Sequence, residues 1–217
     1  SPPRYGERVP FPVPILLALL MLGVVAPVTV EPPLAERPTK ASAPAARAAK
    51  PDPRWVFYTK DKHHYFSPWY AGKHRKMVPY GCTTAPYYDP DPRCADNQGF
   101  HHGLDIAMPC GTRLYAGRHG RVVSHASLGP AYGVNPLLFR NKALGVDFLL
   151  AHTKKVYVQP GDRVAKGQLI AKASDSGAPD GCHLHFEVRV SGGGLDTAQK
   201  PLKLPQPSRS RDRESET

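Results

Sequence analysis

"GVDFLLAHTKKVYVQPGDRVAKGQLIAKASDSGAPDGCHLHFEVRV", residues 145–190, is the stretch that decides the fold. Short apolar or alternating runs (GVDFLLAH, KVYV, QLIAKA and HLHFEVRV) lie between the turn-forming segments QPGD, AKGQ and SGAPDG. Short runs of this kind, bounded by Gly, Pro and Asp, are typical of β-strands. Earlier in the chain LDIAM, RLYAG and GRVVSHA continue the pattern, and no segment between residues 100 and 190 has a convincing helical period. The sequence therefore predicts an all-β core of sandwich or barrel type.

The segments on both sides of this core differ from it in composition. Residues 31–53 hold Pro, Ala and charged residues with almost no large apolar side chain, which predicts a flexible linker. Residues 54–98 are aromatic and basic without a clear period, and we expect an irregular N-terminal arm that wraps the core. Residues 99–203 are predicted to form the functional domain, and the charged residues 204–217 a disordered tail.

The beginning of the chain predicts export. The apolar run at residues 11–30 follows Arg4 and Arg8, which is the layout of a signal peptide or a membrane anchor, and we assign residues 1–30 to it. The four cysteines form an even set behind this segment, which favours two disulfides. They are Cys82, Cys94, Cys110 and Cys182, and no pair has the CxxC spacing of a structural zinc ribbon.

The formal net charge of +11 favours anionic surroundings. Nucleic acid, a membrane surface and bacterial wall polymers all fit such a charge. The sequence has no nucleic-acid recognition motif, and an export signal opposes that function. We therefore expect no nucleic-acid partner, and a membrane contact through the N-terminal segment if it is not cleaved.

Histidines gather at three places in the predicted strands. In HHGLD, residues 101–105, strand alternation puts His101 on the same face as Asp105 and His102 on the opposite face. In HLH, His183 and His185 share a face for the same reason. His152 closes the apolar run DFLLAH.

These residues are suited to zinc chemistry. A catalytic zinc takes three protein ligands and leaves one position open, and His101, Asp105 and His185 would make such a set. The metal would polarise a carbonyl and acidify water, and the two remaining histidines would transfer the proton and stabilise the oxyanion. Each motif alone is weak evidence, and only their combination predicts amide hydrolysis with one zinc per chain.

The order of these motifs resembles a known family. HHGLDIAMPCGTRLYAGRHGRVV, then FLLAH, then VQPGDRVAKGQLIAKASDSGAPDGCHLHFEVR is similar to the lysostaphin-type, LytM-like zinc metalloendopeptidases of bacterial cell walls. The resemblance covers about residues 99–190. It implies a compact β core of two stacked antiparallel sheets and a groove for peptidoglycan peptides. It also implies that His101, Asp105 and His185 are the zinc ligands and that His152 and His183 are the catalytic histidines.

Two features depart from the family pattern. The stretch SLGPAYGVNPLLFRNKALGVD, residues 127–147, lacks the usual strand pair, and the family's tyrosine before the first zinc histidine has no clear match in Tyr87 or Tyr88. Cys110 and Cys182 flank the two ligand strands and would clamp the site if joined, while Cys82 and Cys94 would close a loop. The alternative pairing crosses these two sets.

The leading hypothesis is thus an exported, monomeric zinc endopeptidase, secreted or membrane-anchored, that cleaves peptidoglycan cross-links for wall remodelling or lysis. The alternative is a non-catalytic module of the same fold that binds the wall or activates an amidase. A lipoyl- or biotinyl-type carrier domain also uses GDxVxKGQ turns, but it needs a modifiable lysine at a hairpin tip, and neither MPCGT nor SGAPDG offers one.

Overall fold

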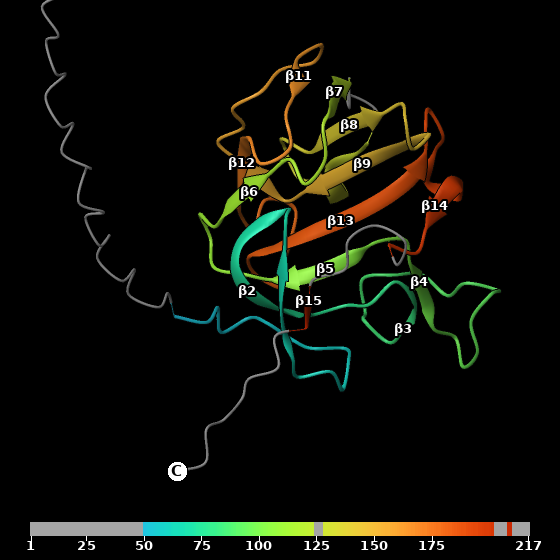
Figure 1. The fold of residues 1–217 in the computed structure, drawn as a ribbon. Coiled ribbons are helices and arrows are strands. Elements are labelled where there is room, and N and C mark those ends of the chain that lie inside the picture. The colour runs from blue at the N-terminus through green and yellow to red at the C-terminus, as the bar shows by residue number, and fades with distance from the viewer. Residues whose placement is uncertain (1–49, 124–127, 202–207, 210–217) are drawn as a thin grey trace, which may run out of the picture. The chain divides into compact units, whose positions relative to one another are not determined.

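The computed structural model describes residues 50–123, 128–201 and 208–209, which fold mainly as β-strands joined by loops (Figure 1). The strands are β1 (His64–Ser67), β2 (Tyr70–Lys76), β3 (Gly81–Thr83), β4 (Gly99–His101), β5 (Leu104–Ala107), β6 (Arg113–Tyr115), β7 (Gly120–Val123), β8 (Leu137–Asn141), β9 (Val146–Ala151), β10 (Thr153–Lys154), β11 (Arg163–Val164), β12 (Leu169–Ala173), β13 (His183–Val190), β14 (Ala198–Gln199) and β15 (Ser208–Arg209). Two 3-10 helices, η1 (Pro130–Tyr132) and η2 (Leu195–Thr197), complete the described elements.

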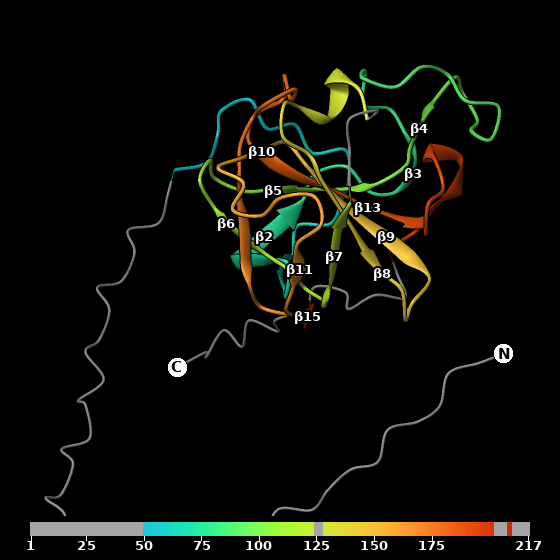
Figure 2. The same ribbon diagram turned by 90° about the horizontal axis from the view of Figure 1, so that it is seen from above.

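One curled antiparallel sheet holds nearly all of these strands. Its order is β10-β12-β6-β2-β5-β13-β9-β8-β7-β11, and only β3 and β4 form a separate pair. The longest strand, β13, lies in the middle between β5 and β9 (Figure 2). The predicted all-β, antiparallel class is confirmed.

The core fills one face of β13. Leu184, Phe186 and Val188 are buried there, with 1%, 7% and 2% of their surface exposed. Trp69 packs against Phe186 at 4.8 Å between ring centroids and against two further phenylalanines, Phe139 and Phe148. Because strand side chains alternate, the opposite face of β13 is free to carry polar groups.

The segment predicted as an irregular arm contributes to the sheet. Residues 54–63 and 84–98 contain no strand, as expected, but β1, β2 and β3 lie between them. Strand β2 pairs with β5 and β6 inside the main sheet, directly after the core residue Trp69. The sequence showed no strand period here because β2 is mostly half-buried, with burial on both faces.

Two other local expectations differ from the structure. KVYV, residues 155–158, was expected to be a strand, but the chain turns at Lys155 with a φ of 48° and continues as coil. Conversely, LLFRN forms β8, which pairs with β7 and β9 as a meander. The predicted export segment, residues 1–30, lies outside the described residues. In the part of the chain that is described, no helix has the length and apolar character to cross a membrane.

Candidate metal centre and active site

The candidate site lies on the polar face of β13. Four polar side chains alternate along this strand with the apolar ones and are all at least 90% buried; they are His183, His185, Glu187 and Arg189. In the antiparallel register His185 lies opposite Asp105 on β5 and opposite Ala151 on β9. The next residue after Ala151 is His152, so the sheet pairing brings three predicted site residues together.

Three predicted ligand atoms converge at this point. Nδ1 of His185 lies 2.8 Å from Oδ1 of Asp105 and 3.1 Å from Nε2 of His101, and Nε2 of His101 lies 3.3 Å from the same carboxylate oxygen. The side chains of His101 and Asp105 are 0% and 3% exposed. All three atoms therefore face one small, dry position.

The route by which His101 reaches this position differs from the expectation. It does not share a strand with Asp105, because His101 ends β4 in the small sheet and β5 begins at Leu104 after a bend. His101 and Asp105 do lie close together, but the expected reason was wrong, because the bend brings them together and not strand alternation. His102 points elsewhere, and its Nε2 accepts a hydrogen bond from Arg93 at 3.1 Å.

The hydrogen bonds behind the two histidines decide which ring nitrogens face the site. Nδ1 of His101 lies 3.0 Å from the carbonyl oxygen of Pro79, and Nε2 of His185 lies 2.7 Å from Oε1 of Glu187. Both partners are acceptors, so these two nitrogens carry protons. In neutral rings the opposite nitrogens are then lone pairs directed at each other and at Asp105. Three acceptors that meet without a donor fit a cation, and the outer hydrogen bonds are those that orient metal-binding histidines.

The electrostatics of the site point in the same direction. Burial alone would lower the pKa of His185, but its hydrogen bonds with Asp105 and Glu187 raise this pKa to about 10. The two buried carboxylates thus require a positive charge between them. A proton on His185 supplies it in the metal-free protein, and a divalent cation held by the three ligands would replace that proton.

The two predicted catalytic histidines lie beside this position. Nδ1 of His152 donates to the carbonyl oxygen of Ser176 at 2.8 Å, and Nδ1 of His183 donates to that of Gly181 at 2.9 Å. The proton on Nδ1 leaves Nε2 of each ring as the acceptor. The ring centroids are 4.4 Å apart, and burial together with the neighbouring His183 lowers the pKa of His152 to about 3. The two rings therefore resist carrying a proton at the same time.

Sequence reasoning missed the residues that support His185. Glu187 accepts from His185 and from the hydroxyl of Tyr132, and its other oxygen accepts from Nε of Arg189 at 2.6 Å. Glu187 is only 1% exposed, and although this burial favours the neutral acid, its hydrogen bonds with His185 and Arg189 lower its pKa and hold it as a carboxylate. The signal was present, because Glu187 and Arg189 continue the polar face of β13 at two-residue intervals. Tyr132 comes from η1 and had no such signal.

A cavity of about 320 Å³ lies over this cluster. Its walls include His101, Asp105, His152, His183 and His185, together with Tyr132 and a pair of neighbouring tyrosines, Tyr87 and Tyr88. The ring of Tyr88 lies 5.1 Å from that of His101, so the structure brings this tyrosine to the site although the sequence spacing could not assign it.

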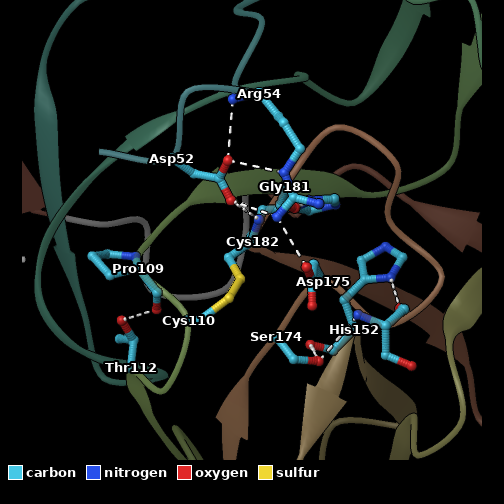
Figure 3. Close-up of a disulfide and its surroundings, with 12 residues drawn as sticks. Asp52, Arg54, Pro109, Cys110, Thr112, His152, Ser174, Asp175, Gly181 and Cys182 are labelled. Atoms are coloured by element: carbon cyan, nitrogen blue, oxygen red, sulfur yellow. Dashed lines mark hydrogen bonds and ion pairs between the residues drawn. A yellow bond between two sulfur atoms is a disulfide. The ribbon is translucent and has the colours of Figure 1, made fainter. Parts of the chain in front are cut away.

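All four predicted disulfide cysteines are paired. Cys82 joins Cys94 with a Cα–Cα distance of 5.5 Å. Cys110 joins Cys182 with a Cα–Cα distance of 5.2 Å (Figure 3). This is the pairing in which the second bond clamps the two ligand strands, and the crossed alternative is excluded. Cys110, Cys182 and Asp175 also lie close together, but sulfurs already joined in a disulfide do not bind a metal.

The arrangement matches a known family. The sequence pattern of peptidase family M23 matches residues 99–197. Residues 99–197 are an M23 peptidase domain. The M23 domain contains all five predicted site residues, and β2 lies outside it.

Several curated proteins are similar to about half of the chain. Peptidoglycan DD-endopeptidase ShyB from Vibrio cholerae is 33% identical over 104 residues, which cover 48% of this chain and 24% of ShyB. Lysostaphin from Staphylococcus staphylolyticus is 31% identical over 106 residues, which cover 49% of this chain and 22% of lysostaphin. The chain thus spans about a quarter of the length of such relatives.

A solved structure is similar as well. The catalytic domain of lysostaphin from Staphylococcus simulans aligns with a TM-score of 0.47 and 30% identity, covering 60% of this chain and 90% of that one.

Proposed function

We propose that this protein is a zinc metalloendopeptidase that hydrolyses peptide bonds in peptidoglycan cross-links outside the cytoplasm. The observation that carries the proposal is the convergence of three buried acceptor atoms, from His101, Asp105 and His185, beside two further histidines in one cavity. The M23 match and the similarity to ShyB and lysostaphin support the substrate class.

The residues have distinct roles in this mechanism. His101, Asp105 and His185 would hold one zinc ion, which supplies a Lewis acid for the carbonyl of the scissile bond. Of the remaining pair, one neutral imidazole accepts the proton of the attacking water and returns it to the leaving amine. The ring centroids of His152 and His183 lie 4.4 Å apart, so positive charges on both rings would repel each other. One ring therefore serves as the base while the other remains neutral.

Glu187 has a supporting role. It orients the ring of His185 and fixes the proton on Nε2, so that Nδ1 faces the metal position. Arg189 and Tyr132 in turn bond to Glu187 and to each other. This network accounts for the burial of three of the four alternating polar residues of β13, namely His185, Glu187 and Arg189.

The disulfides support the proposed location. Two formed disulfides are favoured in an oxidising compartment, where a peptidoglycan hydrolase also meets its substrate. Secretion or membrane anchoring through residues 1–30, and contact of the basic chain with anionic wall polymers, belong to the same proposal.

The proposal is tested by digestion of purified sacculi with the full chain, with products identified by mass spectrometry. We expect peptide-bond cleavage that a chelator abolishes and added zinc restores, and about a thousandfold loss in His185→Ala. His119→Ala is the matched control, because His119 is an exposed histidine that lines a different cavity. Cleavage that persists with the chelator and in His185→Ala would refute the zinc mechanism, and wall binding without cleavage would favour the non-catalytic alternative.

A further inference from the structure

We infer that residues 52–55, here called the strap, are positioning residues for His183. The strap lies outside the M23 domain and about 130 residues before His183 in the chain, yet it holds the backbone of the residue directly before this histidine. The inference rests on the proposed catalytic role of His183.

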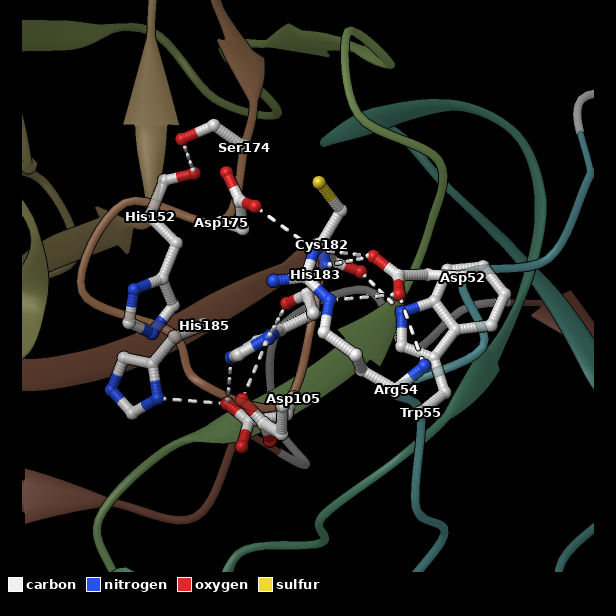
Figure 4. Close-up of polar contacts among 12 residues, drawn as sticks. Asp52, Arg54, Trp55, Asp105, His152, Ser174, Asp175, Cys182, His183 and His185 are labelled. Atoms are coloured by element: carbon white, nitrogen blue, oxygen red, sulfur yellow. Dashed lines mark hydrogen bonds and ion pairs between the residues drawn. The ribbon is translucent and has the colours of Figure 1, made fainter.

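Both backbone polar groups of Cys182 bond to the strap. Its N–H donates to Oδ2 of Asp52 at 3.1 Å, and its carbonyl oxygen accepts from Nε1 of Trp55 at 2.6 Å. Figure 4 shows Asp52 and Trp55 on one side of Cys182 and His152 and His185 on the other. With the disulfide to Cys110, Cys182 is fixed in three directions.

One peptide unit transmits this restraint to the histidine. The N–H that Asp52 accepts belongs to the Gly181–Cys182 peptide, and the C=O of the same peptide accepts from Nδ1 of His183 at 2.9 Å. A trans peptide is planar and its N–H and C=O point in opposite directions, so fixing one end fixes the other. Asp52 thereby positions the carbonyl oxygen of Gly181, which is the acceptor that keeps the proton of His183 on Nδ1. Nε2 of His183 then faces Asp105, 3.7 Å away.

The strap is itself held in place. Nη2 of Arg54 donates to Oδ2 of Asp52 at 2.8 Å and to Oδ2 of Asp175 at 2.9 Å, which ties the strap to the loop between β12 and β13. These hydrogen bonds from Arg54, with the N–H of Cys182, hold the pKa of Asp52 well below its usual range. Asp52 therefore stays a charged acceptor under assay conditions.

The local sequence fits a close contact. A Cβ added to Gly181 would lie 2.8 Å from the carboxylate of Asp52, and Gly181 has a φ of +95°. Only glycine lets the backbone approach the strap in this conformation. Any side chain at position 181 would therefore force the backbone away from Asp52.

The chain provides a matched control for Asp52. Asp91, Pro92 and Arg93 repeat the triplet Asp52, Pro53 and Arg54, and Arg93 bonds to Asp91 through the same three donors, its backbone N, Nε and Nη2. Asp91 belongs to the loop between β3 and β4 and not to the strap. Asp91→Ala therefore removes an equivalent Asp–Arg pair without touching Cys182.

The test compares Asp52→Ala, Trp55→Phe and Asp91→Ala in the zinc-loaded full chain. We expect Asp52→Ala to lower kcat about tenfold at little changed KM and zinc affinity, since small misplacements of a reacting group act on the chemical step. Trp55→Phe keeps the ring, loses one hydrogen-bond donor, and should lower kcat about threefold. Asp91→Ala should match the wild type.

A second readout is independent of activity. Two-bond ¹H–¹⁵N correlations of His183 should show the proton on Nδ1 in the wild type and in Asp91→Ala, and a mixture of tautomers in Asp52→Ala. Three results would each overturn the inference. The first is that the His183 signals are unchanged in Asp52→Ala, and the second is that Asp52→Ala and Asp91→Ala lose the same amount of kcat. The third is that the loss of kcat follows a loss of bound zinc. If Asp52→Ala fails to fold, Trp55→Phe decides. A wild type that cleaves no wall peptide would count against the proposed function, and the His183 signals would then judge the strap alone.

Discussion

At the scale of single residues, the site depends on close packing as much as on its ligands. Gly103 lies between His101 and Asp105 in the chain, directly against the ring of His185. A Cβ at this position would lie 2.6 Å from Cε1 of His185 and 2.9 Å from the carbonyl oxygen of Phe186. Neither atom can move away easily, because β13 is paired on both sides.

Gly103→Ala is therefore expected to displace the ring of His185 and to lower zinc affinity at least tenfold, as other changes behind a metal ligand do. Competition with a chromogenic chelator measures this affinity. Gly194→Ala is the control, because its added Cβ would meet only the terminal oxygen of the exposed Asp196 side chain. Equal zinc affinity in the two variants would show that Gly103 does not limit the position of His185.

At the scale of elements, cross-strand pairs hold the sheet around β13. Arg140 on β8 and Asp147 on β9 are directly opposite in the register, and the guanidinium bonds to both carboxylate oxygens at 2.8 Å. Asp147 is 1% exposed and also accepts from the N–H of Gly192 at 2.8 Å. Although burial favours the neutral acid, these hydrogen bonds lower the pKa of Asp147.

This lowered pKa gives a pH prediction. When folding lowers the pKa of a carboxyl group, the carboxylate stabilises the protein at pH values above its pKa in the unfolded chain, about 4. That stabilisation is lost as the pH falls through the pKa of the folded state. Asp147→Asn should lower the free energy of unfolding at pH 7 and flatten its decrease as the pH falls below about 4. Urea unfolding at several pH values measures both. An unchanged pH slope would mean that Asp147 does not contribute to acid unfolding.

At the scale of the whole molecule, distant segments are joined to one domain. β2 completes the sheet from outside residues 99–197, and the two disulfides close loops of very different length. Cys110 and Cys182 are 72 residues apart, and Cys82 and Cys94 are 12 residues apart. In the chain-entropy description a longer closed loop restricts the unfolded state more.

Replacing Cys110 and Cys182 by Ser should therefore cost about 4 kcal/mol of unfolding free energy, and replacing Cys82 and Cys94 about 3 kcal/mol. Denaturant unfolding of the two double variants measures the difference. The Cys110–Cys182 variant should also lower kcat, because it loosens the residue before His183. If the Cys82–Cys94 variant is the less stable one, loop entropy does not dominate here.

The sequence by itself determined the strand class and predicted five residues that the structure brings together. Alternation along HLHFEVRV sets which side chains share a face, because neighbouring side chains of a strand must point to opposite sides. Short motifs with fixed chemistry, HHGLD and HLH, therefore predicted residues that the structure brings together. Such motifs do not predict where segments without a periodic pattern lie in the fold.

Only the tertiary structure decided the rest. It placed His101 in a separate sheet beyond a bend, β2 inside the main sheet, Tyr132 and Tyr88 over the site, and the strap behind Cys182. The physical reason is common to all four: these positions follow from strand pairing and backbone hydrogen bonds between residues far apart in the chain. Local sequence patterns report which face of a strand is buried, whereas pairing partners depend on the whole sheet.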